Sequence, residues 1–348
     1  MSDSSISWFA DIGLSDRAAV GGKGGSLGEL TRAGIAVPPG FVVRTAAFER
    51  FLRVLEAGAP LRARVEQLRA GDLENIRIVS AELQARLRAA EFPGALGTEL
   101  LAAHAELRAR SGYGDVAVRS SATTEDASDA SFAGLQDTYL WVADGARMLE
   151  RVRDCWASLY SVESISYRRD RGIAESEVAM AVVVQSMVEA RTAGVMFTRS
   201  PTTGDRSVIT IEGPWGLGSA VVGGEVTPDR WVVGKITGEI SVREVSDKHI
   251  EHRRAAGGDV EAAEVAAERR RAPCVSDAEL DRLRQVARQV ERHYGCAQDI
   301  EWAIDARGTL LLLQSRPETV WSAKESAPAA KPATDPLAHV MSIFGGRR

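Results

Sequence analysis

Residues 298–317 read QDIEWAIDARGTLLLLQSRP, and this stretch gives the clearest indication of the fold and of the chemistry. Two runs with strand composition flank the sequence Asp-Ala-Arg-Gly, a pattern that predicts a β-hairpin. Side chains alternate across a strand, so Asp299 and Glu301 are expected on one face of the first strand.

The second strand of this hairpin is expected to carry Leu312, Gln314 and Arg316 on one face by the same alternation. A two- or four-residue connection pairs Glu301 opposite Leu312, and Asp299 opposite Gln314. In that register Glu301 lies diagonal to Gln314, at roughly 7–8 Å between backbones. Both side chains are then expected to reach one ion.

A carboxylate from Glu301 and an amide oxygen from Gln314 are hard ligands of the kind that Mg²⁺ uses together with substrate phosphates. Arg316 is expected to face the same phosphates with its planar guanidinium. The alternative is an edge hairpin whose polar face is solvated, because short motifs carry a known risk of false positives.

The bulk composition is that of an ordinary globular protein, with 348 residues, 45% hydrophobic and 26% charged. The length suggests about two domains. A net charge of −5 argues against a nucleic-acid partner held by a general electrostatic field. The N-terminal Met-Ser-Asp-Ser-Ser does not resemble a signal peptide, and no apolar run approaches a membrane span. The three cysteines, without a CxxC pair, suggest reduced thiols and no zinc, so a cytoplasmic location is expected.

Residues 21–30, Gly-Gly-Lys-Gly-Gly-Ser-Leu-Gly-Glu-Leu, form the first candidate phosphate site. Glycines such as Gly22 let the backbone approach a ligand, and Lys23 offers a point charge. A helix is expected from Ser26 to Ala33, with its N-terminal dipole directed at the same place. The alternative is a flexible loop with a solvated lysine. The segment matches neither the Walker A nor the Rossmann pattern.

A strand over residues 115–121 is expected to present Arg119 near its end as a second cation for phosphate. The following loop, 122–137, is rich in small and hydroxyl-bearing residues, and with Thr138 it suits closure over phosphates through Gly134 and backbone N–H groups. An ordinary surface loop is the alternative, although sixteen structureless residues in a compact domain are uncommon unless functional.

A nearly continuous apolar run over residues 178–188 predicts a strand buried on both faces. It ends at Gln185, followed by Met187 and Val188, and this polar crossing is a candidate hinge for an adenine edge. Simple packing is the alternative for Met187. Glu212, in the next strand-like run, is a further nucleotide-binding candidate.

The remaining segments predict structure more than chemistry. Residues 45–110 indicate three or four helices, residues 144–169 one long helix, and residues 230–245 a hairpin. Residues 249–272 are dense in charge and predict a solvated helix. A further helix is expected over residues 281–293, and the Ala- and Pro-rich residues after Trp321 are typical of a linker.

Taken together, these segments resemble the nucleotide-binding domain of the phosphoenolpyruvate synthase and pyruvate phosphate dikinase family. The match runs in chain order from about residue 12 to residue 320. The segments that carry it are GGKGGSLGEL (21–30), VPPGFVV (37–43), VRSSATTED (118–126), SFAGLQDT (131–138), VVVQSMV (182–188), GVMFT (194–198), GLG (216–218), GEVTPD (224–229), DIEWA (299–303) and LQSRP (313–317).

The resemblance implies an α/β (α+β) chain with an ATP-grasp fold, in which ATP and Mg²⁺ lie between two subdomains. We expect an N-terminal subdomain over residues 1–185, a C-terminal subdomain over residues 186–321 and a linker with a tail over residues 322–348. The family reaction is of the dikinase type: ATP becomes AMP, and its terminal phosphates pass to a histidine before they reach the substrate.

Residue by residue, the resemblance assigns the roles already proposed from the local patterns. The expected phosphate contacts are Lys23, Arg119 and Arg316, with Gly134 and Thr138 in the closing loop; the expected metal ligands are Glu301 and Gln314; the adenine is expected at Gln185 and the backbone after it. Two positions depart from the family pattern, Ser186 and Ser219, where charged residues are common. Neither supplies a phosphate or metal contact in this assignment.

The five histidines, at 104, 249, 252, 293 and 339, include none in a Thr-Ser-His type context. The resemblance therefore implies a separate partner subunit that carries the phosphorylatable histidine and the substrate site, in a layout similar to that of phenylphosphate synthase and acting on a small molecule such as a phenol. Two alternatives stay open: an ATP-binding fragment of a single-chain dikinase or rifampin phosphotransferase-like enzyme, and a non-catalytic ATP-sensing module.

Overall fold

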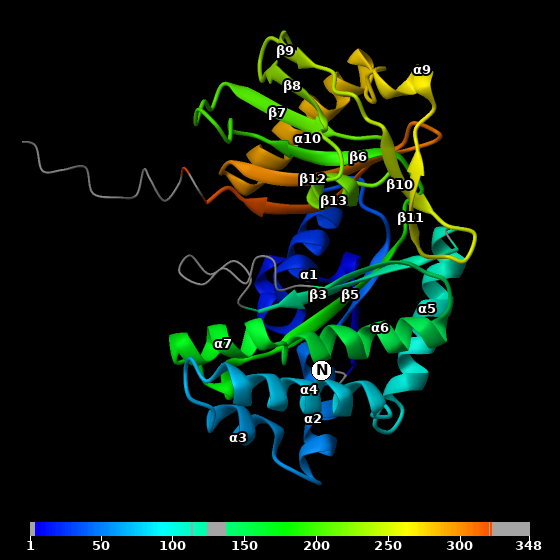
Figure 1. The fold of residues 1–348 in the computed structure, drawn as a ribbon. Coiled ribbons are helices and arrows are strands. Elements are labelled where there is room, and N and C mark those ends of the chain that lie inside the picture. The colour runs from blue at the N-terminus through cyan, green and yellow to red at the C-terminus, as the bar shows by residue number, and fades with distance from the viewer. Residues whose placement is uncertain (1–3, 113, 124–136, 320, 322–348) are drawn as a thin grey trace, which may run out of the picture.

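The computed structural model describes residues 4–112, 114–123, 137–319 and 321. The chain folds around two separate antiparallel sheets, which Figure 1 shows one above the other. The first sheet has the strand order β1-β2-β5-β3-β4. Its strands are β1 (Ile6–Trp8), β2 (Gly40–Val43), β3 (Val116–Ala122), β4 (Thr138–Val142) and β5 (Met180–Ser186).

Six helices pack on one face of this sheet and form with it what we call the first lobe, in the lower part of Figure 1. They are α2 (Thr45–Glu56), α3 (Leu61–Glu66), α4 (Leu73–Ala89), α5 (Leu96–Ser111), α6 (Gly145–Ser158) and α7 (Val162–Arg171). Every residue of β5 is buried, as expected for a central strand paired on both sides. Three or four helices were expected over residues 45–110, and the structure has four, α2 to α5. The lobe's core includes Phe48, Phe51 and Trp156.

The prediction of one helix over residues 144–169 is wrong, because the chain turns between α6 and α7. The turn is fixed by Ser161, whose side chain accepts a hydrogen bond from the backbone N–H of Ser164 and so caps a new helix. Leu159 and Tyr160 in the turn are buried. The break therefore lets the chain bury the turn, and the two helices leave in different directions.

Helix α1 (Arg17–Arg32) lies between the two sheets and touches β3 and β5 on one side and β13 on the other. The glycine-rich segment lies inside this helix, so the predicted loop ahead of Ser26 is wrong. The helical dihedrals break at Gly21 alone, where φ is 71° and a Cβ atom would collide with the carbonyl oxygen of Ser121. The glycines therefore allow α1 to approach β3 closely.

The second sheet has the order β13-β12-β6-β7-β8-β9 and, with its helices, forms the second lobe. Its strands are β6 (Ala190–Phe197), β7 (Val208–Gly213), β8 (Asp229–Gly234), β9 (Ile240–Glu244), β12 (Gln298–Asp305) and β13 (Leu310–Pro317), and its helices are α8 (Ser219–Val222) and α10 (Asp277–Tyr294). The hairpin predicted over residues 230–245 and the helix over 281–293 are confirmed. Trp231 and Trp302 are fully buried in this lobe's core.

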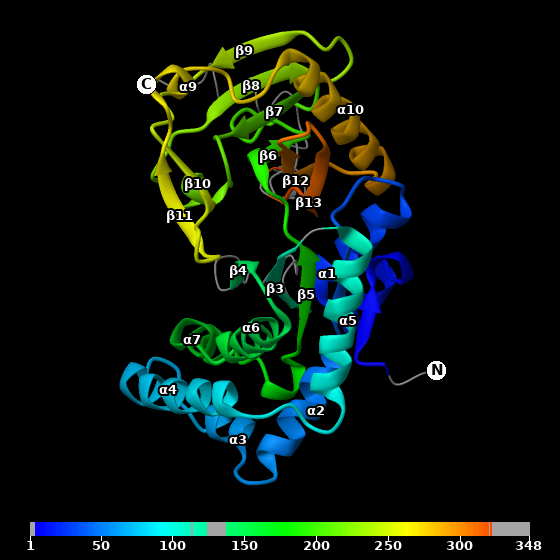
Figure 2. The ribbon, with the colours of Figure 1, turned by 90° about the vertical axis from the view of Figure 1, so that its right-hand side faces the viewer.

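Residues 249–272 do not form the predicted helix; they form the hairpin of β10 (Ile250–Arg254) and β11 (Val260–Glu264), followed by the short α9 (Ala267–Arg270). The signal for the turn was Gly257–Gly258, which lies between the two strands. Figure 2 shows this hairpin running alongside both lobes, from the second sheet toward β4. The hairpin therefore connects the second sheet with the region of β3 and β4, which is distant in sequence.

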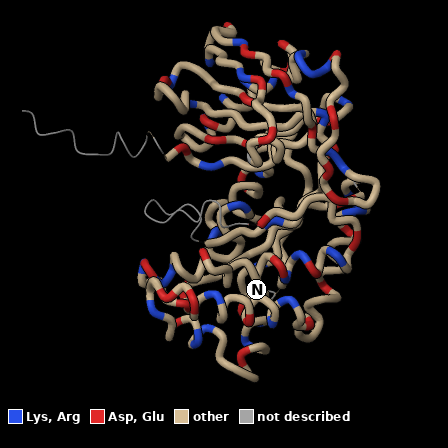
Figure 3. Tube along the Cα trace, in the orientation of Figure 1, with Lys and Arg blue, Asp and Glu red and all other residues tan. Residues whose placement is uncertain are grey.

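The fold confirms the expected α/β class and places the two sheets on either side of α1. The exact subdomain bounds, 1–185 and 186–321, remain a prediction, although the chain does pass from one sheet to the other between Ser186 and Ala190. The predicted tail, 322–348, lies outside the described residues. Within those residues, no helix combines the length and apolar character needed to cross a membrane. Figure 3 shows both signs of charge interspersed over both lobes.

Three short 3-10 helices complete the description: η1 (Phe9–Asp11) and η2 (Leu14–Asp16) precede α1, and η3 (Glu175–Glu177) precedes β5.

Candidate functional site: a cleft between the two sheets

The predicted hairpin is present as β12 and β13, but its register differs from the expected one. Glu301 lies directly opposite Gln314, and Asp299 lies opposite Arg316. The cause is a β-bulge next to Glu301, which inserts Leu313 into the second strand and shifts the pairing. Leu312 consequently lies in the core of the second lobe and does not share a face with Gln314. The predicted pair of oxygen ligands is thus brought closer than the diagonal arrangement allows.

Arg119 joins this hairpin from the other sheet. Its Nη2 donates to Oε2 of Glu301 at 2.9 Å and to Oε1 of Gln314 at 2.7 Å, and its Nη1 donates to the carbonyl of Leu313 at 2.9 Å. Arg119 is only 8% exposed, whereas the Glu301 side chain is 44% exposed. Three residues predicted from distant segments therefore meet at one point between the lobes.

Asp299 and Arg316 lie next to this point on the same hairpin. Arg316 Nε is 3.5 Å from Asp299 Oδ2, and Asp299 Oδ1 is buried without a hydrogen-bond partner among the described residues. Burial raises the pKa of Asp299 to about 6, with Arg316 opposing the rise and Glu318 adding to it. Arg316 is 53% exposed, so its guanidinium is accessible to a ligand.

A cleft of about 480 Å³ opens from this point between the two sheets, a size suited to a nucleotide. Seven of the predicted site residues line it: Arg119, Thr138, Gln185, Met187, Val188, Glu212 and Glu301. Its end near β4 is apolar, where Ala117, Leu140 and Leu217 surround Met187. The cleft therefore has an apolar end and a charged end.

The hinge residues Gln185 and Met187 already form hydrogen bonds with other parts of the protein, which the sequence did not indicate. The side-chain amide of Gln185 donates to the carbonyl of Pro38 at 3.3 Å, and Gln185 is 3% exposed. The backbone N–H of Met187 donates to the carbonyl of Asp115 at 3.0 Å. Gln185 therefore holds the hinge against the loop before β2, and one N–H of its side-chain amide is already in use.

Of the other predicted phosphate residues, Gly22 and Lys23 do not line the cleft. Gly22 and Lys23 lie in α1 beside β3, and Lys23 is 7% exposed. Ser26, one turn further on, donates to the carbonyl of Ser315 at 2.5 Å and so fixes α1 against β13. Gly134 lies outside the described residues, while Thr138, at the start of β4, is exposed.

Glu212 occupies the wall formed by β7. Burial raises its pKa, and Arg230, whose Nε is 3.7 Å from Glu212 Oε1, opposes the rise. A half-buried carboxyl group of this kind favours a partner that donates hydrogen bonds.

The oxygen atoms of Glu301 and Gln314 fit a hard divalent cation. Both accept from the same nitrogen of Arg119, so they converge on a single position that already holds positive charge. Two protein oxygens are a sufficient set for Mg²⁺, which takes its other ligands from water and phosphate. In the described part of the chain, no group of three or more His, Cys, Asp or Glu side chains is placed to hold a metal.

With this geometry in hand, comparison with known proteins gives the family. Residues 17–335 match the family described as "Pyruvate phosphate dikinase, AMP/ATP-binding domain". The chain belongs to this family. The resemblance read from the sequence is therefore confirmed, together with an adenine nucleotide as the ligand class of the domain.

Several curated relatives of this dikinase-domain family are similar over most of the chain. A probable phosphoenolpyruvate synthase from Methanothermobacter thermautotrophicus is 43% identical over 316 residues, which cover 90% of this chain and 46% of the relative. The phosphoenolpyruvate synthase from Aeropyrum pernix is 39% identical over 360 residues, covering 94% and 44%. A rifampicin phosphotransferase from Streptomyces sp is 39% identical over 310 residues, covering 89% and 35%. The chain thus spans less than half the length of each.

Two features of the dikinase-domain cleft were missed from the sequence. From the sequence, Asp299 was placed on the same face as Glu301 but assigned no role. The alternation of side chains along the strand was the feature that could have indicated a role beside Glu301. Ser219 lines the cleft and bonds His252 at 2.8 Å, a contact that no local pattern showed because β10 was expected to be helical.

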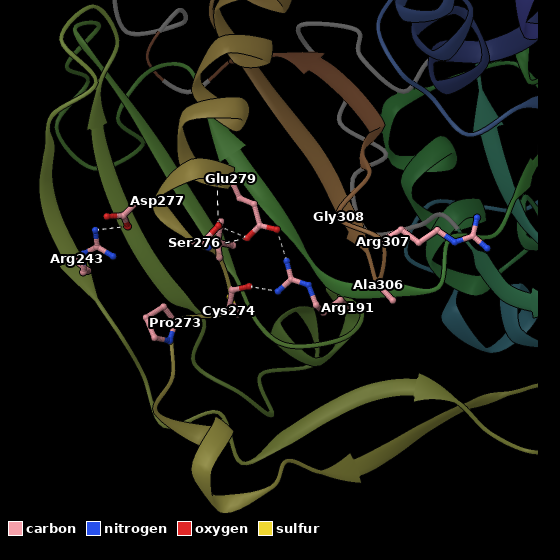
Figure 4. Close-up of a pocket in the computed structure, with 11 residues that line it drawn as sticks. Arg191, Arg243, Pro273, Cys274, Ser276, Asp277, Glu279, Ala306, Arg307 and Gly308 are labelled. Carbon is pink, nitrogen blue, oxygen red and sulfur yellow. Dashed lines mark hydrogen bonds and ion pairs between the residues drawn. The ribbon is translucent and has the colours of Figure 1, made fainter.

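A second hollow of about 590 Å³, drawn in Figure 4, lies over the start of α10 and is also lined by arginines. Two of its three arginines are paired within it: Arg191 bonds Glu279 at 2.6 Å, and Arg243 bonds Asp277 at 2.6 Å. These pairs hold the chain around α10, so this hollow lacks the convergent groups of the cleft.

Proposed function

We propose that this chain is the ATP-binding unit of a dikinase-type phosphotransferase. In this function it transfers the terminal phosphates of ATP to a histidine on a separate partner subunit and releases AMP. The partner then passes phosphate to a small molecule such as a phenol. The observation that carries the proposal is the convergence of Arg119, Glu301 and Gln314 at the charged end of the cleft, in a chain of the AMP/ATP-binding family.

The two ends of the cleft suit the two ends of ATP. Adenine fits the apolar end, against Met187 and Val188, and the phosphates fit the end where Arg119 and Glu301 lie. The sugar then lies between them, near Glu212. Burial favours the apolar ring on one side, and charge neutralisation favours the phosphates on the other.

The cations around the charged end would position the phosphates. Arg119, Lys23 and Arg316 come from three different elements, so they can approach a triphosphate from different sides. Mg²⁺, held by Glu301 and Gln314, would supply neutralisation of the phosphate charge. Such a cation would compete with Arg119 for these oxygens, and a guanidinium displaced from them would be available to the phosphates.

The histidine that accepts the phosphates is assigned to a partner because of where the described histidines lie. His104 is buried in α5, His293 bonds Glu29, and His252 bonds Ser219. Within the described residues, no histidine lines the cleft. An external histidine that reaches the charged end satisfies the geometry of phosphoryl transfer, which depends on positioning and charge neutralisation.

The proposal is tested with ATP labelled at the β-phosphate, mixed with this protein, Mg²⁺ and an extract of the source cells. We expect acid-labile label on a separate polypeptide and AMP as the nucleotide product. ADP as the main product, or label on this chain, would contradict the proposal.

A second candidate function is the same chemistry within a single longer chain, favoured by the similarity to the rifampicin phosphotransferase. The intact mass of the native product decides between them. A mass well above 37.4 kDa would favour the single-chain form, with its acceptor histidine in the same polypeptide.

A further inference from the structure

His252 links Ser219 to Glu225 beside the cleft, through a hydrogen bond on one side of its ring and a charged contact on the other. Ser219 Oγ is 2.8 Å from His252 Nδ1, and His252 Nε2 is 3.2 Å from Glu225 Oε1. Ser219 begins α8 and lines the cleft, while His252 lies in the middle of β10 with its side chain 12% exposed. A residue of the β10–β11 hairpin therefore supports a residue of the cleft wall.

The main chain of His252 supports the same wall. Its carbonyl accepts the N–H of Leu217 at 2.9 Å, and Leu217 also lines the cleft. The contact requires glycine at position 216, because φ there is 68° and a Cβ atom would collide with the His252 carbonyl oxygen. His252 thus holds Leu217 through its backbone and Ser219 through its ring.

The direction of these hydrogen bonds determines what Ser219 offers to a ligand. The carboxylate of Glu225 beside Nε2 favours a hydrogen on that nitrogen, so in the neutral imidazole we assign the hydrogen to Nε2 and the acceptor role to Nδ1. The Ser219 hydroxyl must then donate to Nδ1. Its lone pairs remain as acceptors on the cleft side, where a ligand hydroxyl can donate to them.

The position of Ser219 in the cleft indicates which part of a nucleotide it meets. Two residues earlier, Leu217 belongs to the apolar cluster with Met187, where the base fits. The phosphates fit at Arg119 and Glu301. A polar acceptor next to the base end, with Glu212 also on the cleft wall, suits the hydroxyl groups of the sugar.

We propose that His252 is a positioning residue of the nucleotide site, which holds Leu217 in place and orients Ser219 as an acceptor for a sugar hydroxyl. This inference rests on the proposed function, because it assumes that the cleft binds ATP. His252 itself does not touch the nucleotide. Its effect is confined to the nucleoside half of the ligand.

The test is calorimetric titration of the full chain with MgATP, with its 2′-deoxy and 3′-deoxy analogues, and with magnesium tripolyphosphate, which lacks the nucleoside. His252→Asn keeps an acceptor near the position of Nδ1, whereas His252→Gln keeps a polar group near Nε2 and loses the one facing Ser219. His249→Ala is the matched control, since His249 is an exposed histidine three residues away. Thermal unfolding of each variant checks that it is folded.

We expect His252→Gln to bind MgATP about tenfold more weakly, or about 1.4 kcal/mol, and tripolyphosphate as the wild type does. His252→Asn and His249→Ala are expected within about twofold of the wild type for both ligands. The wild type is expected to bind at least one deoxy analogue about five- to tenfold more weakly than ATP, and Ser219→Ala to remove that difference, the loss expected for one hydrogen bond.

Unchanged MgATP affinity in His252→Gln overturns the inference, and so does an equal loss for tripolyphosphate, which would show a general structural role. These outcomes leave the proposed function intact. Failure of the wild type to bind MgATP at all overturns the proposed function, and this inference with it.

Discussion

Two arginine–carboxylate pairs join the first sheet region to other parts of the molecule, and they differ in which member is buried and which is exposed. Arg119 reaches from the first sheet to Glu301 in β12 at 2.9 Å. Arg254 reaches from β10 to Asp115, just before β3, at 2.7 Å. In the first pair the arginine is buried and the carboxylate is 44% exposed; in the second the arginine is 44% exposed and the carboxylate 11%.

The difference indicates two different roles. The carboxylate of Glu301 opens into the cleft, where in the proposed function a cation would compete for it, so the first pair would exchange partners. Asp115 and Arg254 lie outside the residues that line the cleft, and Arg254 also packs over Trp141 at 5.8 Å. The second pair can persist whatever the cleft holds. We therefore interpret Arg119–Glu301 as a contact that a ligand replaces, and Arg254–Asp115 as a permanent contact, which we call the tether.

The largest expected effect is on catalysis. Arg119→Met is expected to lower the rate of AMP formation by about a thousandfold or more, because a preorganised cation at transferring phosphates contributes on that scale. Arg254→Met is the matched control and should remain within a few-fold of the wild type. Quenched assays of nucleotide products, run with the acceptor partner present, measure both. Equal losses in the two variants would abolish the distinction between the pairs.

The next effect concerns Asp299, beside the first pair. Its pKa, raised to about 6, means that the folded protein favours the neutral carboxyl group. The contribution of Asp299 to the free energy of unfolding is therefore fully present below about pH 4 and is lost as the pH rises through 6. Asp299→Asn mimics the neutral form at every pH. The variant should therefore gain stability over the wild type as pH rises, by at most about 3 kcal/mol above pH 7.

Urea unfolding at several pH values between 4 and 8 measures this gain. Asp281→Asn is the control of opposite sign, because hydrogen bonds from Arg284 and Gln285 lower the pKa of Asp281. A stability difference for Asp299→Asn that does not change with pH would show that Asp299 titrates normally.

The pair of Arg254 and Asp115 should contribute to the free energy of unfolding. Arg254→Met leaves the mostly buried Asp115 without its cation, at an expected cost of about 1–3 kcal/mol. Arg253→Met, at the neighbouring position, breaks only the exposed pair with Glu261 and should change stability by less than about 0.5 kcal/mol. Equilibrium unfolding compares them, and equal values would show that Arg254 does not act as a tether.

The smallest expected effect is on the affinity for Mg²⁺ in the absence of nucleotide. Because Arg119 and a divalent cation share the oxygens of Glu301 and Gln314, Arg119→Met should strengthen Mg²⁺ binding without nucleotide, by about threefold. Glu301→Gln should weaken it. Titration calorimetry with Mg²⁺ measures both, and chelation of Mg²⁺ should weaken ATP binding to the wild type. Unchanged Mg²⁺ affinity in Arg119→Met would mean that the arginine and the cation occupy different places.

The sequence by itself determined the elements and the residue types of the candidate site. Alternation and composition gave the strands that carry Arg119, Glu301 and Gln314, and the motif order indicated the family that the comparison confirmed. These features are local: period-2 alternation and helical periodicity depend on neighbours within a few residues, so one chain segment is enough to show them.

The tertiary structure alone decided how these residues meet. The bulge that sets Glu301 opposite Gln314 depends on packing Leu312 into the core of the second lobe. The glycines near Lys23 are helical because α1 must approach β3, and residues 249–272 form a hairpin that connects both lobes. Register, close approach and contacts between lobes arise from segments far apart in the chain, 195 residues for Arg119 and Gln314 and 289 for Ser26 and Ser315, which local patterns do not encode.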